Sequence, residues 1–448
     1  MTRDIHPAKP RGWRALLVLV TIAIAATIAP ASTLAAEPND MVTRWNAHAI
    51  AAIANAGTAP TPGLGQVPPL APINLAIVHG AIYDAVNAID GGHEPYLDDL
   101  PSAPATASKA AAAATAAHDV LVGIAAASPT VIASLDGLLV SSLAGIDAGP
   151  AKDAGIAIGR AVAAAMLLDR TGDGRGGSGL FTVGDAPGEW VTVVPLSNNV
   201  FAWIRQVRPF SLSSGSQLRV APPPLLTSEQ YAAEFNEVKG LGRQTLSTRS
   251  PEQTSLAGWA SGNPFVFMNT GLREIAAAQH LSTSEQARLF AMTSMSSADA
   301  LIACWDNKDH YNVWRPQSAI RAAANDGNPA TEPDTAWLSL IPTPGYPDLP
   351  SGFNCISAGM MYAARLYFGS DQMSFQLTSP GITVALPNVP VGVPPSTRTY
   401  TRFSDVIRDS IEGRILNGLH FRDADEKGAW IGKKAAQWLE KHEFQPVD

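Results

Sequence analysis

A pair of basic residues among aromatic ones is the first sign of chemistry in this chain. The segment KDHYNVWRP places Lys308 and Arg315 seven residues apart, which is two turns of a continuous helix and one helix face. Such a pair is most often a solvated stripe. Here, however, Trp305, Tyr311 and Trp314 are interleaved with it, and the preceding segment is nearly uncharged. We therefore expect both cations to be buried, and buried cations need an anionic partner.

A second segment, YPDLPSGFN, offers hydrogen-bond donors. Ser351 and Gly352 stand at the predicted start of a helix, where a hydroxyl and a backbone N–H can donate to an anion. A serine there is also a common helix cap, and capping alone would explain it. Phe353 follows directly, although a polar side chain would be expected to face an anion.

A third segment, GRILNGLHFRDADEKG, combines a cation with an imidazole. Arg414 and His420 are six residues apart and so lie about 120° from each other on an ideal helix. They converge only if the helix ends between them, and Asn417 with Gly418 is a plausible stop. His420 would then lie on the following turn and point back at the anion that Arg414 contacts.

The elements that position these segments are predicted to be helices. Residues 41–170 are alanine-rich with apolar residues three and four apart, as packed helices require. A stretch of about fifty residues rich in Gly, Pro and Ser follows, and loops of this length usually cover a site. Helical periodicity returns over residues 228–324 and again near the C-terminus, while SFQLTSPGITVALPNVPVGV alternates like a β-hairpin. We predict a mainly α fold of two helical bundles that share a core.

The N-terminus indicates export. Residues 1–36 combine a basic start, the apolar run ALLVLVTIAIA and the small residues STLAAE, which together make a secretory signal. An uncleaved membrane anchor is the alternative. Cleavage removes four basic residues and one acidic residue, which changes the net charge from −8 to −11 and argues against a nucleic-acid partner. We expect a secreted or periplasmic protein with no membrane span after cleavage.

The expected domain boundaries follow from these patterns. Residues 1–36 are the signal peptide, and residues 37–225 form the N-terminal bundle with its Gly/Pro-rich loop region. Residues 226–448 form the C-terminal bundle that carries the three motifs, packed with the first as one unit. Cys304 lies one turn before Lys308 and Cys355 one turn after Ser351, so the two sulfurs either form a disulfide or pack as buried thiols.

Taken in order, the motifs K-x6-R-P, P-S-G and R-x5-H resemble those of one superfamily, which joins the vanadium-dependent haloperoxidases to the type 2 phosphatidic acid phosphatases. DAVNAIDGGHEPY, PPPLLTSEQYAAEFNEVKGLG and WDNKDHYNVWRPQSAIR are similar to the exported bacterial haloperoxidase branch, so the resemblance covers nearly all of the mature chain. It implies two α-helical bundles and a pocket for vanadate, with phosphate able to occupy the same site. The substrates it implies are small: hydrogen peroxide, halide and an organic acceptor, or a phosphate ester.

The resemblance also implies a role for each motif residue. The equatorial oxygens of the oxyanion would be neutralised by three cations, Lys308, Arg315 and Arg414. The Ser351 hydroxyl and the Gly352 amide would hydrogen-bond these oxygens. His420 would be the axial ligand to vanadium, or the nucleophile toward phosphorus, and completes the predicted catalytic set. Four residues are expected to line the pocket: Trp305, Tyr346, Phe353 and Asn354.

Three positions depart from the family pattern. The family usually has a histidine after P-S-G that moves a proton to or from the apical oxygen. Phe353 stands at that position and cannot move a proton. Asn354 or His310, acting through water, are the candidates to take over this proton transfer. Gly413 stands where a serine commonly precedes the arginine.

The third departure concerns the partner of the axial histidine. The phosphatases often have an aspartate four residues after that histidine, but Ala424 occupies the position here, between Asp423 and Asp425. Either aspartate could orient His420, and each could equally cap the last helix.

Three functions therefore stay open. The first is an exported vanadate-dependent haloperoxidase with weakened or altered activity, because missing acid–base chemistry typically costs about 10²–10⁴-fold in rate. The second is a phosphomonoesterase with His420 as nucleophile. The third is a non-redox protein that binds an anion or a natural product. The halide, the organic substrate and the oligomeric state are not determined by the sequence.

Overall fold

Small side chains in the first third of the chain allow five helices to pack closely. The computed structural model describes residues 40–55, 69–125, 128–193, 198–381 and 395–447, so the predicted signal segment lies outside the described residues. The five helices are α1 (Met41–Asn55), α2 (Leu70–Asp90), α3 (Lys109–Ile124), α4 (Pro129–Ala144) and α5 (Pro150–Asp169). A Cβ on Gly159 of α5 would lie 2.7 Å from the Ala112 carbonyl oxygen of α3, so glycine sets the distance between these two helices.

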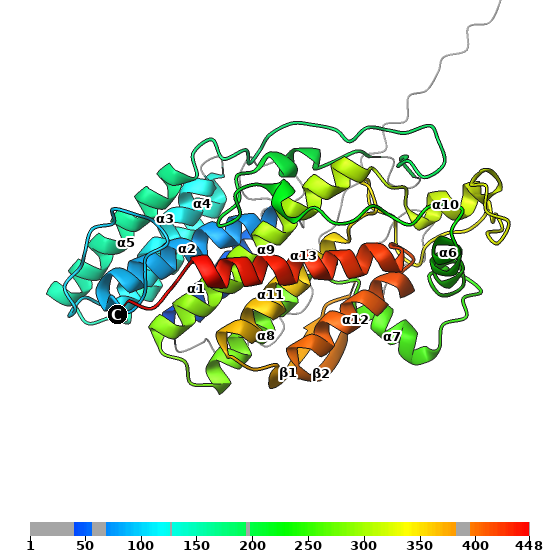
Figure 1. Cartoon of the computed structure of the whole chain (residues 1–448). Coiled ribbons are helices and arrows are strands. Elements are labelled where there is room, and N and C mark those ends of the chain that lie inside the picture. Colours follow the sequence, from blue (N-terminus) through cyan, green and yellow to red (C-terminus); the bar gives the residue numbers. More distant parts are fainter. Residues whose placement is uncertain (1–39, 56–68, 126–127, 194–197, 382–394, 448) are drawn as a thin grey trace, which may run out of the picture. The chain divides into compact units, whose positions relative to one another are not determined.

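The second half of the chain is built around one long buried helix. This helix, α9 (Thr283–Tyr311), begins at a capping box of Ser282 and Glu285 and is buried along most of its length. The other helices are α6 (Glu229–Leu241), α7 (Pro251–Trp259), α8 (Pro264–Ala278), α10 (Pro316–Ala322), α11 (Gly352–Tyr367), α12 (Phe403–Leu416) and α13 (Arg422–His442). Figure 1 shows α13, in red, running beside α9 and α11, and it packs against both.

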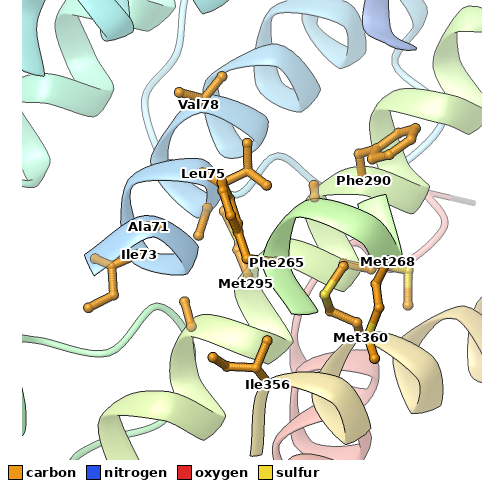
Figure 2. Close-up of a cluster of buried hydrophobic side chains, with 14 of the residues drawn as sticks. Ala71, Ile73, Leu75, Val78, Phe265, Met268, Phe290, Met295, Ile356 and Met360 are labelled. Atoms are coloured by element: carbon orange, nitrogen blue, oxygen red, sulfur yellow. The ribbon is translucent and has the colours of Figure 1, made fainter. Parts of the chain in front are cut away.

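The early and late helices share one apolar core. Helix α2 packs against α3 and α5 on one side and against α9 on the other. Figure 2 shows the result: side chains from α2 meet side chains from α8, α9 and α11, among them Leu75, Met268, Met295 and Met360. The predicted site lies at the C-terminal end of α9 and the N-terminal end of α11. Packing in this core therefore holds the backbone of both helices in place near the site. The mainly α fold predicted from periodicity is confirmed.

The Gly/Pro-rich region is held against α9 by side chains of that helix. It contains two short 3-10 helices, η1 (Ala202–Gln206) and η2 (Gly215–Leu218). The buried Asp299 carboxylate accepts hydrogen bonds from three successive backbone N–H groups, those of Phe210, Ser211 and Leu212, at 2.6, 2.9 and 3.1 Å. Asp299 of α9 therefore fixes this part of the Gly/Pro-rich loop, which has no periodic pattern of its own.

The β-hairpin is present, but its second strand comes later than predicted. Strand β1 (Gln372–Ser379) pairs antiparallel with β2 (Ser396–Arg402), and Phe375 is opposite Tyr400. Residues 382–394, which include most of the predicted second strand, lie outside the described residues. In the part of the chain that is described, no helix has the length and apolarity needed to cross a membrane.

Candidate oxyanion-binding site

Lys308 and Arg315 converge, although not on one helix face as predicted. Helix α9 ends at Tyr311, and Asn312 turns the chain with a left-handed conformation, φ 48°. Arg315 follows in an extended conformation directly before Pro316, the first residue of α10. A residue before proline disfavours the helical conformation, so Pro316 was the sequence signal that the helix had ended. The two cations meet instead because both bind the segment 346–350.

Lys308 is fully buried and anchors this segment. Its ammonium donates to the carbonyl oxygens of Pro347, Asp348 and Pro350, at 2.7, 2.9 and 2.5 Å. Burial lowers the pKa of Lys308 to about 8. Since its three N–H groups all have partners, Lys308 contributes positive charge and holds the P-S-G turn in place.

Arg315 is fully buried and keeps a donor without a partner. Its Nε donates to the Tyr346 carbonyl at 2.9 Å, and Nη1 donates to the Leu419 carbonyl at 3.0 Å. Nη1 also lies 3.1 Å from Nε2 of His420. Among the described residues Nη2 has no hydrogen-bond partner. This free N–H group points to a missing acceptor, because buried donors are nearly always paired.

His420 lies against Asp348, a residue to which the sequence analysis assigned no role. Helix α12 ends at Leu416, and Gly418, with φ 74°, turns the chain so that His420 lies before α13. Its Nδ1 is 2.6 Å from Oδ1 of Asp348, and both side chains are almost wholly buried. Asp348 was detectable in principle, because it is the one acid within YPDLPSG.

Electrostatics keep this imidazole neutral. Burial holds the pKa of His420 well below its ordinary value, and so do three nearby cations, Arg315, Arg414 and Lys308. Burial raises the pKa of Asp348 to about 7, against the opposing effect of Arg315 and Lys308. Three cations from different segments therefore act on one neutral ring.

Neither aspartate of the last helix contacts His420, which corrects that part of the sequence interpretation. Asp423 forms an ion pair with Lys427 one turn later, at 2.7 Å. Asp425 is fully buried and accepts a hydrogen bond from Nδ2 of Asn354 at 2.7 Å. Because α13 begins at Arg422, both acids lie in its first turns, and neither forms a hydrogen bond or ion pair with His420 among the described residues.

Arg414 stacks on the residue that departs from the family pattern. Its guanidinium carbon lies 4.9 Å from the centre of the Phe353 ring, and Nη1 donates to the Ala260 carbonyl at 3.0 Å. Its buried Nε has no partner among the described residues. A Cβ on Gly413 would lie 2.3 Å from Cβ of Ala260, so the glycine in place of the family's serine allows α12 to approach the end of α7.

Ser351 stands at the start of α11 without capping it. The side chain makes no capping hydrogen bond, so the capping alternative does not describe this serine. Its backbone N–H donates to the Ala424 carbonyl at 2.8 Å, and its hydroxyl accepts from Nδ2 of Asn354 at 3.3 Å. Gly352 is held close to Trp305, since an added Cβ would be 2.9 Å from the indole ring.

A cavity of about 230 Å³ lies beside this cluster. Of the four predicted lining residues, Trp305, Tyr346 and Phe353 line it, together with Arg414 and apolar neighbours such as Ile356 and Leu419. Asn354 does not line it, because its side chain faces Asp425. His310 is exposed at the end of α9, against Tyr311, and lies outside the cluster.

The two cysteines are buried free thiols in this structure. Sγ of Cys304 lies 3.5 Å from the Pro350 carbonyl oxygen. Burial and the neighbouring Cys304 raise the pKa of Cys355 well above its ordinary value. Of the two alternatives drawn from the sequence, the structure therefore has the unbonded pair.

The donor set fits a tetrahedral or five-coordinate oxyanion. Arg315 and Arg414 each keep a buried N–H without a partner, and Lys308 adds a third positive charge next to a neutral imidazole. Like charges this close repel one another, and an oxyanion would relieve the repulsion while accepting the free hydrogen bonds. Fold and cluster together define an α-helical protein with a buried, cation-rich cluster whose donors suit an oxyanion.

Comparison with known proteins makes this class more specific. Residues 288–448 match the family described as the vanadium chloroperoxidase (VCPO) second helical-bundle domain. Vanadium chloroperoxidase from Curvularia inaequalis is 30% identical over 180 residues, which cover 33% of this chain and only 29% of that protein.

Two solved structures extend the likeness to the fold of nearly the whole chain. One, described as the first bacterial vanadium-dependent iodoperoxidase, superposes with a TM-score of 0.70 at 21% identity, over 91% of this chain and 96% of that chain. A holo-type bacterial vanadium-dependent chloroperoxidase gives 0.68 at 17% identity over the same shares. Residues 288–448 thus match the vanadium chloroperoxidase second-domain family, and the chain has the fold of these vanadium haloperoxidase structures. The resemblance inferred from the three motifs is confirmed.

Proposed function

We propose that this chain is a vanadate-dependent haloperoxidase that oxidises halide with hydrogen peroxide at the cluster around His420. The observation that carries the proposal is a neutral imidazole whose Nδ1 lies 2.6 Å from Oδ1 of Asp348, next to cations that keep free buried donors. Bound vanadate would supply Lewis-acid activation of peroxide. The same site would accept phosphate, because both oxyanions present oxygens to the same donors.

Each residue of the cluster has a distinct task in this proposal. Asp348 lies 2.6 Å from Nδ1 of His420, so Nε2, which is now 3.1 Å from Nη1 of Arg315, is the ring atom that would hold vanadium. Arg315 and Arg414 would donate to oxygens of the bound oxyanion and stabilise its negative charge without reorganisation. The Ser351 hydroxyl and the Gly352 amide would add two further donors at the start of α11.

Phe353 limits what this site can do with protons. Its ring supports Arg414 and lines the cavity, but it cannot take or give a proton during halide oxidation. Acid–base catalysis contributes roughly 10²–10⁴-fold in enzymes that use it, so we expect halide oxidation to be slow.

A phosphomonoesterase is the second candidate, and the cavity favours it. About 230 Å³ of mostly apolar space adjoins Arg414 and Leu419, where the alcohol part of a phosphate ester would fit. His420 would attack phosphorus through Nε2, with Arg315 and Arg414 on the phosphoryl oxygens. This reaction depends less on residue 353, because the leaving group or a water molecule can handle the proton.

One set of measurements on purified protein separates these functions. The protein is incubated with vanadate, its bound vanadium is measured, and bromide oxidation, iodide oxidation and hydrolysis of a chromogenic phosphate ester are assayed. Stoichiometric vanadium with peroxide-dependent halogenation that is lost in His420→Ala supports the haloperoxidase. Phosphate release lost in the same variant supports the phosphatase instead. Anion binding with neither activity indicates a non-redox binding protein.

The location of the protein is part of the proposal. The basic, apolar and small-residue pattern of residues 1–36 supports export to the periplasm or medium. Sequencing the N-terminus of the protein recovered from those fractions would show cleavage near Ala35 or Ala36. A full-length protein retained in the cell would contradict it.

A further inference from the structure

A buried carboxyl lies directly behind the serine of the P-S-G motif. Asp425, in the first turns of α13, is wholly buried, and its Oδ1 accepts from Nδ2 of Asn354 at 2.7 Å. The same amide nitrogen donates to Oγ of Ser351 at 3.3 Å. An acid, an amide and a hydroxyl therefore form one contiguous group at the start of α11.

This group is held by close contact between two helices. A Cβ on Gly428 of α13 would lie 2.5 Å from the Ser351 carbonyl oxygen, so the backbones approach as closely as a glycine allows. The Ser351 N–H also donates to the Ala424 carbonyl at 2.8 Å. Neither the serine nor the acid can move away without separating α11 from α13.

The hydrogen bonds of this carboxyl suit a neutral acid better than a carboxylate. Oδ2 of Asp425 is buried and makes no hydrogen bond among the described residues. A buried carboxylate oxygen left unpaired is costly, whereas the same oxygen can carry a proton in the neutral acid. Burial accordingly raises the pKa of Asp425 well above its ordinary value.

The charges that face Asp425 come from three neighbouring elements. Hydrogen bonding from the Ser351 hydroxyl and the positive charge of Arg414 in α12 favour its ionised form and lower its pKa, whereas Asp348 of the segment 346–350 opposes ionisation. Helix α11 contributes the hydroxyl of Ser351, the amide of Asn354 and the neutral thiol of Cys355. Burial outweighs Arg414, which makes no ion pair with Asp425 in the described part of the chain.

We propose that Asp425 is a protonated positioning residue whose carboxyl O–H donates to the Ser351 hydroxyl oxygen, so that the serine's own proton is directed at the bound oxyanion. A serine hydroxyl has one donor and two acceptor sites. When Asn354 and Asp425 fill both acceptor sites, only the donor remains for the anion. An ionised Asp425 would instead take the serine's proton and turn a lone pair toward the oxyanion. The inference rests on the proposed function, in that Ser351 faces a bound oxyanion.

The test is the pH dependence of inorganic phosphate binding in wild type and Asp425→Asn, measured by calorimetry. The amide of the variant donates to Ser351 at every pH and so imitates the neutral acid. We expect the two proteins to bind phosphate within about twofold of each other at pH 6, and wild type to become roughly tenfold weaker than the variant at alkaline pH, since one hydrogen bond to a charged group is lost. Comparing the two at each pH cancels the titration of phosphate and of the other cluster residues.

The controls separate this inference from the proposed function. In a Ser351→Ala background, Asp425→Asn should no longer change the pH dependence, because there is no hydroxyl to orient. Parallel pH profiles of wild type and Asp425→Asn, or an Asp425→Asn variant ten times weaker at pH 6, would overturn the inference while leaving the oxyanion site intact. A wild-type protein that binds neither phosphate nor vanadate would overturn both.

A second measurement needs neither ligand nor activity. The difference spectrum of wild type minus Asp425→Asn at pH 7 should contain the infrared C=O stretch of a protonated carboxylic acid, because other carboxyls of raised pKa such as Asp348 contribute to both proteins and cancel. If that variant fails to fold, the difference between wild type and Ser351→Ala serves instead, because loss of the accepting hydroxyl should shift this C=O stretch. A difference spectrum that shows only an ionised carboxylate at residue 425 would contradict the proposal.

Discussion

Two buried clusters in this protein each combine an arginine with a histidine, and they differ in how their donors are used. The first cluster joins α1, α2 and α8: Nη1 of Arg273 donates to Asn46 at 2.6 Å, and Nδ2 of Asn46 lies 2.9 Å from Nε2 of His79. Nη2 of Arg273 donates to the Thr270 hydroxyl at 2.9 Å. In the oxyanion cluster, by contrast, Nη2 of Arg315 is buried without a partner.

The difference shows which feature marks a ligand site. Both imidazoles are buried and neutral, since burial lowers the pKa of His79 to about 3 and that of His420 well below its ordinary value. A buried histidine is therefore no sign of function by itself. An unpartnered buried nitrogen is no sign by itself either, since Nδ1 of His79 also has no partner among the described residues. The oxyanion cluster differs because three cations surround one ring and two of these cations keep free donors, an arrangement that costs free energy until an anion binds.

The largest expected difference in anion binding is between two alanine substitutions, one of Arg315 and one of Arg273. We expect Arg315→Ala to weaken vanadate and phosphate binding by roughly a hundredfold, because hydrogen bonds to charged groups contribute about 1.5–3 kcal/mol each. Arg273→Ala should lower the melting temperature but leave both dissociation constants within about twofold, since its partners are all internal. Calorimetry with each anion and thermal unfolding provide the two readouts. Unchanged vanadate affinity in Arg315→Ala would remove this residue from the site.

A smaller loss of anion affinity is expected when Asp348, which lies against the His420 imidazole, is replaced. Asp348→Asn cannot hold His420 in the same tautomer as firmly, and loss of such a partner typically lowers metal affinity about 10–100-fold. Phosphate binding should weaken less than vanadate binding, because only vanadium bonds to Nε2. Asp423→Asn is the matched control, as Asp423 pairs with Lys427 away from the ring. Equal losses for both anions would show that Asp348 acts through charge alone.

The smallest effect expected is a gain of function at residue 353. Phe353→His places a proton carrier beside Arg414, whose positive charge 4.9 Å from the present ring should keep the new imidazole neutral. We expect peroxide-dependent halide oxidation to rise about tenfold, the lower part of what acid–base catalysis supplies. Phe353→Leu, which has no proton to move, should show no gain. If wild type already oxidises halide as fast as Phe353→His, another group carries the proton.

The sequence by itself was sufficient for the class of fold and for the motifs from which the site was predicted. The order and spacing of the three motifs pointed to an oxyanion pocket of the vanadium haloperoxidase type, and apolar periodicity predicted helices on either side of it. The end of α12 near Asn417 and Gly418 was also predictable, because a glycine with φ 74° terminates a helix for local reasons. Properties of this kind depend on residues close together in the chain.

Only the tertiary structure decided which side chains are neighbours within that site. Asp348 reaches His420 from 72 positions earlier in the chain, and Asp425 reaches Asn354 from 71 positions later. No local spacing distinguishes Asp348 from Asp423 or Asp425 as the partner of the imidazole. The packing of α13 on α11 decides which aspartate lies next to His420. The direction in which each acid of α13 points depends on the contacts of the whole helix and not on the acid's own neighbours in sequence.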